Sequence, residues 1–129
     1  MRLSEELAGR IVERLRTVLK REVLLTDDEG VVRAATDPVQ VGILHPIAHG
    51  VAGQPGTVVI DRAEASKYHN MVASVLHPLW HEGELLGVFV FPGSKRDFPA
   101  GTLKLIQGLV EIVMFQYELA EALETKEET

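Results

Sequence analysis

The stretch GELLGVFVFPG, residues 83–93, follows LHPLW, residues 76–80, and the two together decide the fold. Glu82-Gly83-Glu84 separates two apolar runs, and a glycine supplies the positive backbone dihedral that a tight hairpin turn requires. The second run is so apolar that we expect a central strand, with one face on a helix layer and the other lining a pocket. We expect Gly87 to be its one solvent-tolerant position.

The length and composition predict a single domain over residues 1–129. A chain of 129 residues with 46% hydrophobic content fits one globular core. No run reaches the roughly 18 apolar residues that a membrane span needs, and the first six residues are charged rather than signal-like. We therefore expect a cytoplasmic chain that makes no membrane contact.

Charge and cysteine content exclude several function classes. The chain has no Cys, which excludes disulfides, thiolate metal sites and cysteine nucleophiles. Its net charge of −6 argues against a nucleic-acid surface, because phosphate neutralisation needs clustered Lys and Arg. We expect no direct nucleic-acid contact by this chain.

Helical periodicity marks both ends of the chain. A first helix is predicted from about Leu3 to Lys20, with Ser4 as its N-terminal cap. A long closing helix is predicted over residues 102–124, where apolar residues recur at helical spacing. These residues are Leu103, Ile106, Leu109, Val110, Val113, Tyr117, Ala120 and Leu123.

Five strands and a short helix are predicted between the two long helices. The short helix has Pro46 near its first turn and ends near Gly50 or Gly53. Asp61 to Asn70 forms a polar segment with room for one helical turn. The strands cover residues 22–26, 31–35, 57–60, 71–81 and 84–92.

This order of elements predicts an α+β fold with a PAS-like or GAF-like layout. The five strands form one antiparallel sheet, and the long N- and C-terminal helices pack together on one of its faces. The apolar rhythm of the last helix is explained by packing on its own sheet, or by pairing with a second copy as well. We expect a homodimer that pairs through the terminal helices.

Four of the five histidines lie in two similar hexads, residues 44–49 and 76–81. On a helix, His45 and His49 share the spacing used by zinc ligands. On a strand, His77 and His81 lie about 13 Å apart, which one ion cannot bridge. Without Cys or a close acidic ligand, we expect neither a metal nor a cofactor.

The order of elements, the segment VGILH at residues 41–45, and Leu79 followed by EGELLGV at residues 82–88 resemble the sugar diacid recognition domain. This domain is the N-terminal sensor of bacterial carbohydrate-diacid regulators, and the resemblance covers about residues 3–123. It implies that the domain binds a small hydroxylated carboxylate, such as glucarate, galactarate or glycerate, and signals to a C-terminal helix-turn-helix that regulates transcription.

The chain departs from the family pattern in two ways. The family commonly has Arg where this chain has Gln40, and a polar Asn where this chain has Leu76. In addition, no DNA-binding domain follows, so we expect either a sensor fragment or a stand-alone module that acts through a partner.

A carboxylate pocket can be assembled from the remaining residues. His45 at a helix start donates from its ring, free backbone amides point at the anion, and Gly42 lets the anion approach. His77, on a strand that faces the short helix, contacts the other end of the ligand, and Ser74 adds a hydroxyl. Arg33 supplies a bidentate cation. The alternatives are histidines satisfied by backbone carbonyls, and an exposed strand charge at Arg33.

Two further function classes compete with a ligand sensor. An enzyme is disfavoured, because no nucleophile elbow, phosphate-binding glycine loop or bracketed acid pair is present, and we expect no catalytic residue. A ligand-free dimerisation module derived from a sensor would explain the loss of two polar family positions.

Overall fold

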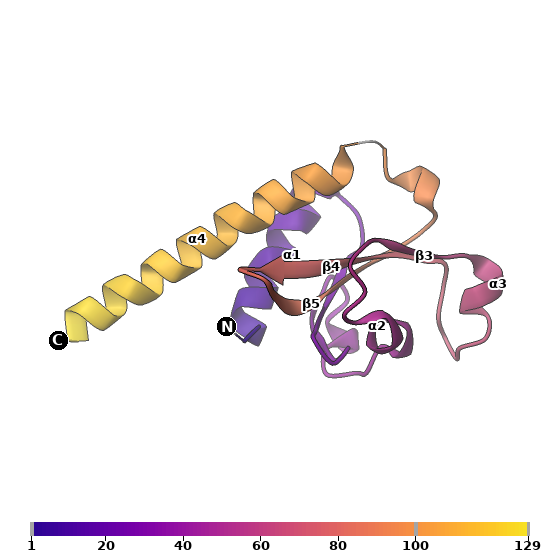
Figure 1. The fold of residues 1–129 in the computed structure, drawn as a ribbon, viewed down its shortest axis with the longest axis horizontal. Coiled ribbons are helices and arrows are strands. Elements are labelled where there is room, and N and C mark those ends of the chain that lie inside the picture. The colour runs from indigo at the N-terminus through magenta and orange to yellow at the C-terminus, as the bar shows by residue number, and fades with distance from the viewer. Residues whose placement is uncertain (1, 100, 129) are drawn as a thin grey trace.

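One five-stranded antiparallel sheet organises the molecule (Figure 1). The structure is a computed structural model that describes residues 2–99 and 101–128, with side chains up to residue 124. The strand order is β2-β1-β5-β4-β3. The strands are β1 (Leu24–Asp27), β2 (Val32–Ala35), β3 (Val58–Ile60), β4 (Ser74–His81) and β5 (Glu84–Pro92). The helices are α1 (Glu5–Leu19), η1 (Pro38–Gln40), α2 (Pro46–Val51), α3 (Arg62–Ala65), η2 (Lys95–Asp97) and α4 (Thr102–Glu128).

The β4–β5 hairpin predicted from the sequence is confirmed. Its turn consists of Glu82 and Gly83, with φ angles of 52° and 77°, and His81 pairs with Glu84 across it. Two successive positive φ angles match the right-handed twist of the flanking strands. β5 is also the central strand of the sheet, because β1 pairs along one of its edges and β4 along the other.

Gly87 corrects one expectation, because it is buried rather than solvent-tolerant. A Cβ atom at this position would lie 1.9 Å from the carbonyl oxygen of Thr26 on the neighbouring strand. The close approach of two backbones, and not exposure, therefore requires glycine here.

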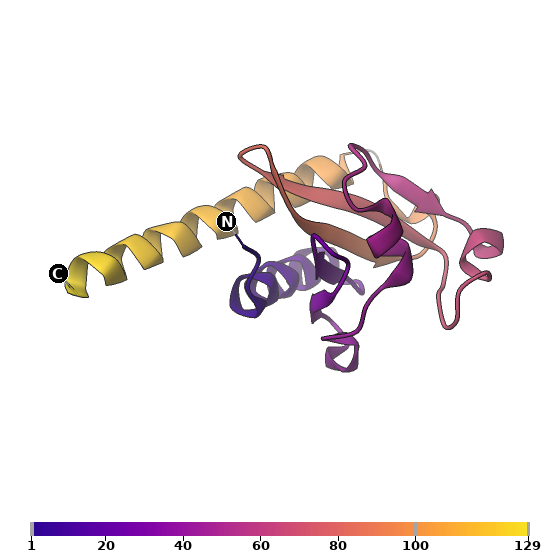
Figure 2. The same cartoon turned by 60° about the horizontal axis from the view of Figure 1, so that its bottom comes forward.

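The two long helices pack on the same face of the sheet, as expected. Ser4 caps α1 by accepting a hydrogen bond from the amide of Leu7 at 3.1 Å. Leu7, Ile11 and Leu15 of α1 are buried in one cluster with residues of the sheet and of α4. The sheet contributes Leu25, Ala34, Val75, Leu79, Phe89 and Phe91, and α4 contributes Ile106, Val110, Val113 and Met114. Figure 2 shows α1 and α4 running beside the strands.

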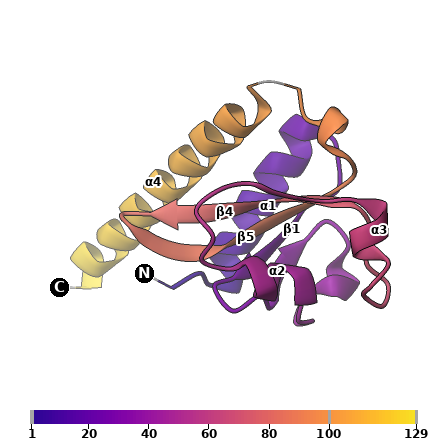
Figure 3. The same ribbon diagram turned by 45° about the vertical axis from the view of Figure 1, so that its right-hand side comes forward.

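A second apolar cluster covers the opposite face of the sheet. Ile47 and Ala48 of α2 pack there against buried residues of four strands. These are Leu24 of β1, Val32 of β2, Leu76 of β4, and Val88 and Val90 of β5. Figure 3 shows α2 lying in front of β1 and β5, away from α4. β5 thus has one face on the helix layer and the other beneath α2.

The α+β architecture predicted from the sequence, one antiparallel sheet with both long helices on one face, is confirmed. Element boundaries differ by a few residues. β4 begins at Ser74 rather than Met71, because Ser74 is where pairing with both Ile60 and Pro92 starts. β1 begins at Leu24 rather than Glu22, and α4 extends to Glu128. Among the helices of residues 2–99 and 101–128, none combines the length and apolar character that crossing a membrane requires.

Candidate functional site

A cavity of about 210 Å³ lies at the edge of the second apolar cluster, beside the start of α2. It brings together two of the residues predicted from the sequence, His45 and Ser74. Its apolar walls come from β1, β5 and the segment before β4. The full lining is Glu22, Leu24, Gln40, His45, Asn70, Met71, Val72, Ser74, Val90 and Pro92. We call it the α2 cavity.

His45 is held by the helix that it caps. Its Nδ1 accepts a hydrogen bond from the amide of Ala48 at 3.1 Å, and only 7% of the residue is exposed. A neutral ring that accepts at Nδ1 carries its proton on Nε2, so Nε2–H is the donor that remains. Burial lowers the pKa of His45 below its ordinary value, which favours this neutral form. His45 can therefore donate one hydrogen bond to a ligand without losing its capping role.

Ser74 is a buried hydroxyl at the first position of β4. Its Oγ donates to the carbonyl of Val72 at 2.9 Å. Because that bond uses the hydroxyl proton, the lone pairs of Oγ remain to accept from a ligand hydroxyl.

Three more polar residues line the α2 cavity: Gln40, Asn70 and Glu22. From the sequence, Gln40 is only a departure from a family pattern, and Asn70 and Glu22 are not predicted as site residues. Asn70 has a left-handed backbone with φ of 58°, which places it at a sharp bend before β4. Among the lining residues Glu22 is the one carboxylate, and none is Lys or Arg. Neutral donors and acceptors therefore dominate this cavity.

The backbone amides near Gly42 are largely committed to the fold, unlike the expected anion cradle. Gly42 donates to the carbonyl of Val32 at 2.7 Å, and Ile43 donates to that of Gln40 at 3.2 Å. The amide of His45 donates to the carbonyl of Gly30 at 2.9 Å. Gly42 is exposed with φ of 90° and does not line the α2 cavity, so its glycine serves a turn.

His77 lies on the other face of the sheet, contrary to the expectation that it faces the short helix. It lines a separate cavity of about 360 Å³ between β4 and α4. Its Nδ1 is 2.9 Å from Oγ1 of Thr57, and burial lowers its pKa. His77 and His45 therefore cannot contact one small ligand together.

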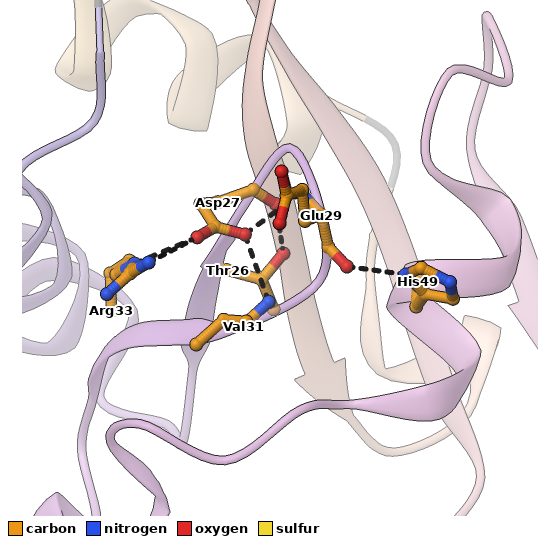
Figure 4. Close-up of polar contacts among 6 residues, drawn as sticks. All are labelled: Thr26, Asp27, Glu29, Val31, Arg33 and His49. Carbon is orange, nitrogen blue, oxygen red and sulfur yellow. Dashed lines mark hydrogen bonds and ion pairs between the residues drawn. The ribbon is translucent and has the colours of Figure 1, made fainter.

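Arg33 is paired within the fold instead of facing the α2 cavity (Figure 4). Its Nε and Nη2 lie 2.9 and 2.7 Å from Oδ2 of Asp27. Oδ1 of Asp27 accepts from the amides of Glu29 and Val31 at 2.9 and 3.0 Å. Burial raises the pKa of Asp27, but the bonds from Val31, Arg33 and Glu29 together hold that pKa below its ordinary value.

Beside the Asp27–Arg33 ion pair, the β1–β2 turn is hydrogen-bonded to α2. Nδ1 of His49 donates to the carbonyl of Glu29 at 2.6 Å (Figure 4). A Cβ on Gly30, where φ is 93°, would lie 2.7 Å from the backbone nitrogen of His49. His45 and His49, which shared a zinc-like spacing, thus each have a partner in the fold. Because His45 lines the α2 cavity and His49 bonds to the β1–β2 turn, α2 links this cavity to the first hairpin.

The sequence from residue 3 to residue 129 matches the family model described as "Putative sugar diacid recognition". The chain belongs to this family. It is 25% identical over 104 residues to the uncharacterised protein YsfB of Bacillus subtilis strain 168. The match covers 80% of this chain but only 28% of YsfB, so the chain spans under a third of that relative.

Two solved structures are similar to this chain in architecture. Residues 122 to 287 of a methyl-accepting chemotaxis protein superpose with a TM-score of 0.58 at 18% identity, covering 84% of this chain and 85% of that one. The GAF domain of an Acinetobacter phosphoenolpyruvate-protein phosphotransferase gives 0.55 at 16% identity, covering 93% and 88%. At these identities the likeness shows the fold alone. The family is described as one of recognition domains, and the two solved domains share its fold.

Proposed function

We propose that this domain senses a small hydroxylated carboxylate, a sugar diacid or a glycerate-like acid, in the α2 cavity. The observation that carries the proposal is the pairing of a buried His45 with a buried Ser74 at one cavity of about 210 Å³. His45 offers a ring N–H to a ligand oxygen, and Ser74 offers lone pairs to a ligand hydroxyl. Gln40 and Asn70 offer amides that both donate and accept.

The arrangement favours binding over catalysis. The Ser74 hydroxyl donates to a backbone carbonyl, and the acceptor nitrogen of His45 is occupied by the Ala48 amide. Neither contact forms the nucleophile–base pair that acyl transfer would need. A retained ligand-binding role therefore explains these two residues better than an enzyme would.

Signalling would follow from the attachment of α2 to the sheet. A ligand that contacts His45 and Ser74 bridges the α2 layer and β4, and the opposite face of β4 and β5 supports α1 and α4. If it binds one arrangement of these layers more tightly, it shifts the population toward that arrangement. We propose that α4 passes this shift to a transcriptional output in a partner or a further domain.

The test is calorimetric titration of the purified domain with glycerate, glucarate and galactarate. His45→Asn keeps a helix-capping residue but removes the ring N–H, so we expect affinity to fall by about tenfold or more. His77→Asn, on the opposite face, is the matched control and should leave affinity unchanged. An equal loss of affinity in both variants, or no loss in His45→Asn, would show that the α2 cavity is not the binding site.

A ligand-free interaction module is the second candidate. It is favoured by the absence of Lys and Arg from the α2 cavity lining. A domain that no carboxylate or polyol stabilises against heat, and that still associates with itself, would support this candidate instead.

A further inference from the structure

The outward face of α4 carries a line of exposed apolar side chains. Leu105, Ile112, Phe115 and Leu119 are each about half exposed or more, and Phe115 reaches 67%. Together with Gly108 and Ala122 they form one stripe along the helix, which we call the outer seam. Large contiguous apolar surface on a domain of this size marks an interaction site.

The spacing of the outer seam is that of a coiled coil. Its residues are separated alternately by three and four positions from residue 105 to residue 122. Such a 3.5-residue period keeps one stripe facing a partner helix, with residues in the a and d positions. The sheet is packed by a different stripe, which contains Ile106, Val110 and Val113. α4 therefore has two apolar faces, and its own domain covers only one.

α4 also continues beyond the body of the domain. Glu118 still contacts His81 of β4, but every side chain from Leu119 to Glu124 beyond it is exposed. Figures 1 and 3 show this end of α4 extending past the β4–β5 hairpin. The outer seam runs without interruption from the supported part of α4 into this projecting part. Isolated short helices are marginal in water, so a helical partner would stabilise the projection.

We propose that the outer seam binds the outer seam of a second copy of this chain, with the two α4 helices parallel about a two-fold axis. A heptad stripe is self-complementary under such symmetry, because each layer meets its own copy. The flanking charges favour the parallel arrangement, because Glu111 then faces the neutral Gln116 of the second copy. Glu118, on the same flank of the seam, is bonded within its own chain, where its Oε1 lies 2.9 Å from Nε2 of His81. Antiparallel alignment of the whole seam would instead place Glu111 against Glu118 of the second copy, twice.

The first test measures mass in solution by light scattering. The unaltered chain should be a dimer, and Ile112→Glu should be a monomer because it buries an unpaired charge in the seam. Val39→Glu replaces a residue of η1 that is 75% exposed and outside the seam, so it should remain dimeric. Circular dichroism should show that both variants are folded, with Ile112→Glu losing at most the helical signal of the projecting end of α4. A monomeric parent chain, or a dimeric Ile112→Glu, overturns the proposal.

A second test fixes the direction of the helices. The chain has no Cys, so a single introduced thiol is unambiguous. In the parallel pair, Leu119→Cys faces its own copy and should form an intermolecular disulfide on mild oxidation. Gln107→Cys lies off the seam and should not. Failure of Leu119→Cys to cross-link in a dimeric protein overturns the parallel arrangement.

Discussion

The α-carbon of Gly87 lies so close to Thr26 that a Cβ atom would be 1.9 Å from the Thr26 carbonyl oxygen. We predict that Gly87→Ala destabilises the domain by about 3 kcal/mol or more, because β1 and β5 must move apart to admit the methyl group. Urea denaturation followed by circular dichroism measures the change.

Gly9→Ala is the matched control for this substitution. Gly9 lies within α1, and a Cβ there would meet no atom within 4 Å. Alanine should therefore raise stability by about 0.5–1 kcal/mol through its helix propensity. A similar loss of stability in both variants would show that the β1–β5 contact is not the cause.

Stability should fall as pH falls below the ordinary histidine pKa of about 6.5. Burial lowers the pKa of both His45 and His77 in the folded state, so the unfolded chain binds more protons in this range. Stability is therefore complete above pH 6.5 and is lost progressively as pH falls toward the lower folded-state pKa values. Urea midpoints at pH 7.5 and 5.5 should show the loss.

His45→Asn should reduce that pH dependence, because asparagine caps a helix without titrating. Gln54→Asn, an exposed position outside the cavity lining, introduces the same residue without removing a titrating group and should leave the dependence unaltered. If both variants behave as the parent chain does, His45 is not a source of the effect.

Asp27 should be needed for the first hairpin. Asp27→Ala removes the acceptor of the Glu29 and Val31 amides and leaves Arg33 without its carboxylate, which should cost about 2–3 kcal/mol. Asp28→Ala, at an exposed position in the same turn, should cost less than about 0.5 kcal/mol. Thermal unfolding of the two variants provides the comparison.

Gln40→Arg should shift ligand preference toward diacids. Gln40 lines the α2 cavity with His45 and Ser74, and an Arg fork binds carboxylates bidentately. We expect glucarate affinity to rise about tenfold relative to glycerate. Gln54→Arg, at an exposed position outside the cavity lining, controls for the added charge. Equal gains in both variants would contradict a specific contact at position 40.

The sequence predicted those features that depend on local chemistry. The Glu82-Gly83 turn, the Ser4 cap and the short helix with Pro46 near its first turn each follow from residues a few positions apart, and each is confirmed. The exposure predicted for Gly87 was wrong, because glycine is required there by the close carbonyl oxygen of Thr26 on another strand. No pattern within one strand reveals how closely a neighbouring backbone approaches.

The candidate site could be predicted only in part, because some of its residues come from segments that are distant in the sequence. His45 and Ser74 do meet at one cavity, but Ser74 and His77 are separated by an odd number of positions on β4, and alternation places them on opposite faces. That error was avoidable from spacing alone. The involvement of Glu22 and Asn70 was not foreseeable, because it depends on how the segments before β1 and β4 fold over the sheet.

The pairing of β1 with β5 has a consequence for how the domain folds. Leu24 and Val90 are partners in this pairing, and both line the α2 cavity. Closing a loop that spans about half the chain is entropically costly and slows folding. The cavity therefore forms only once β1 has paired with β5, the strand pairing that joins the residues farthest apart in the sequence. A ligand that fills the cavity would contact both ends of that loop and stabilise its closure. Binding competence would then report that β1 has paired with β5.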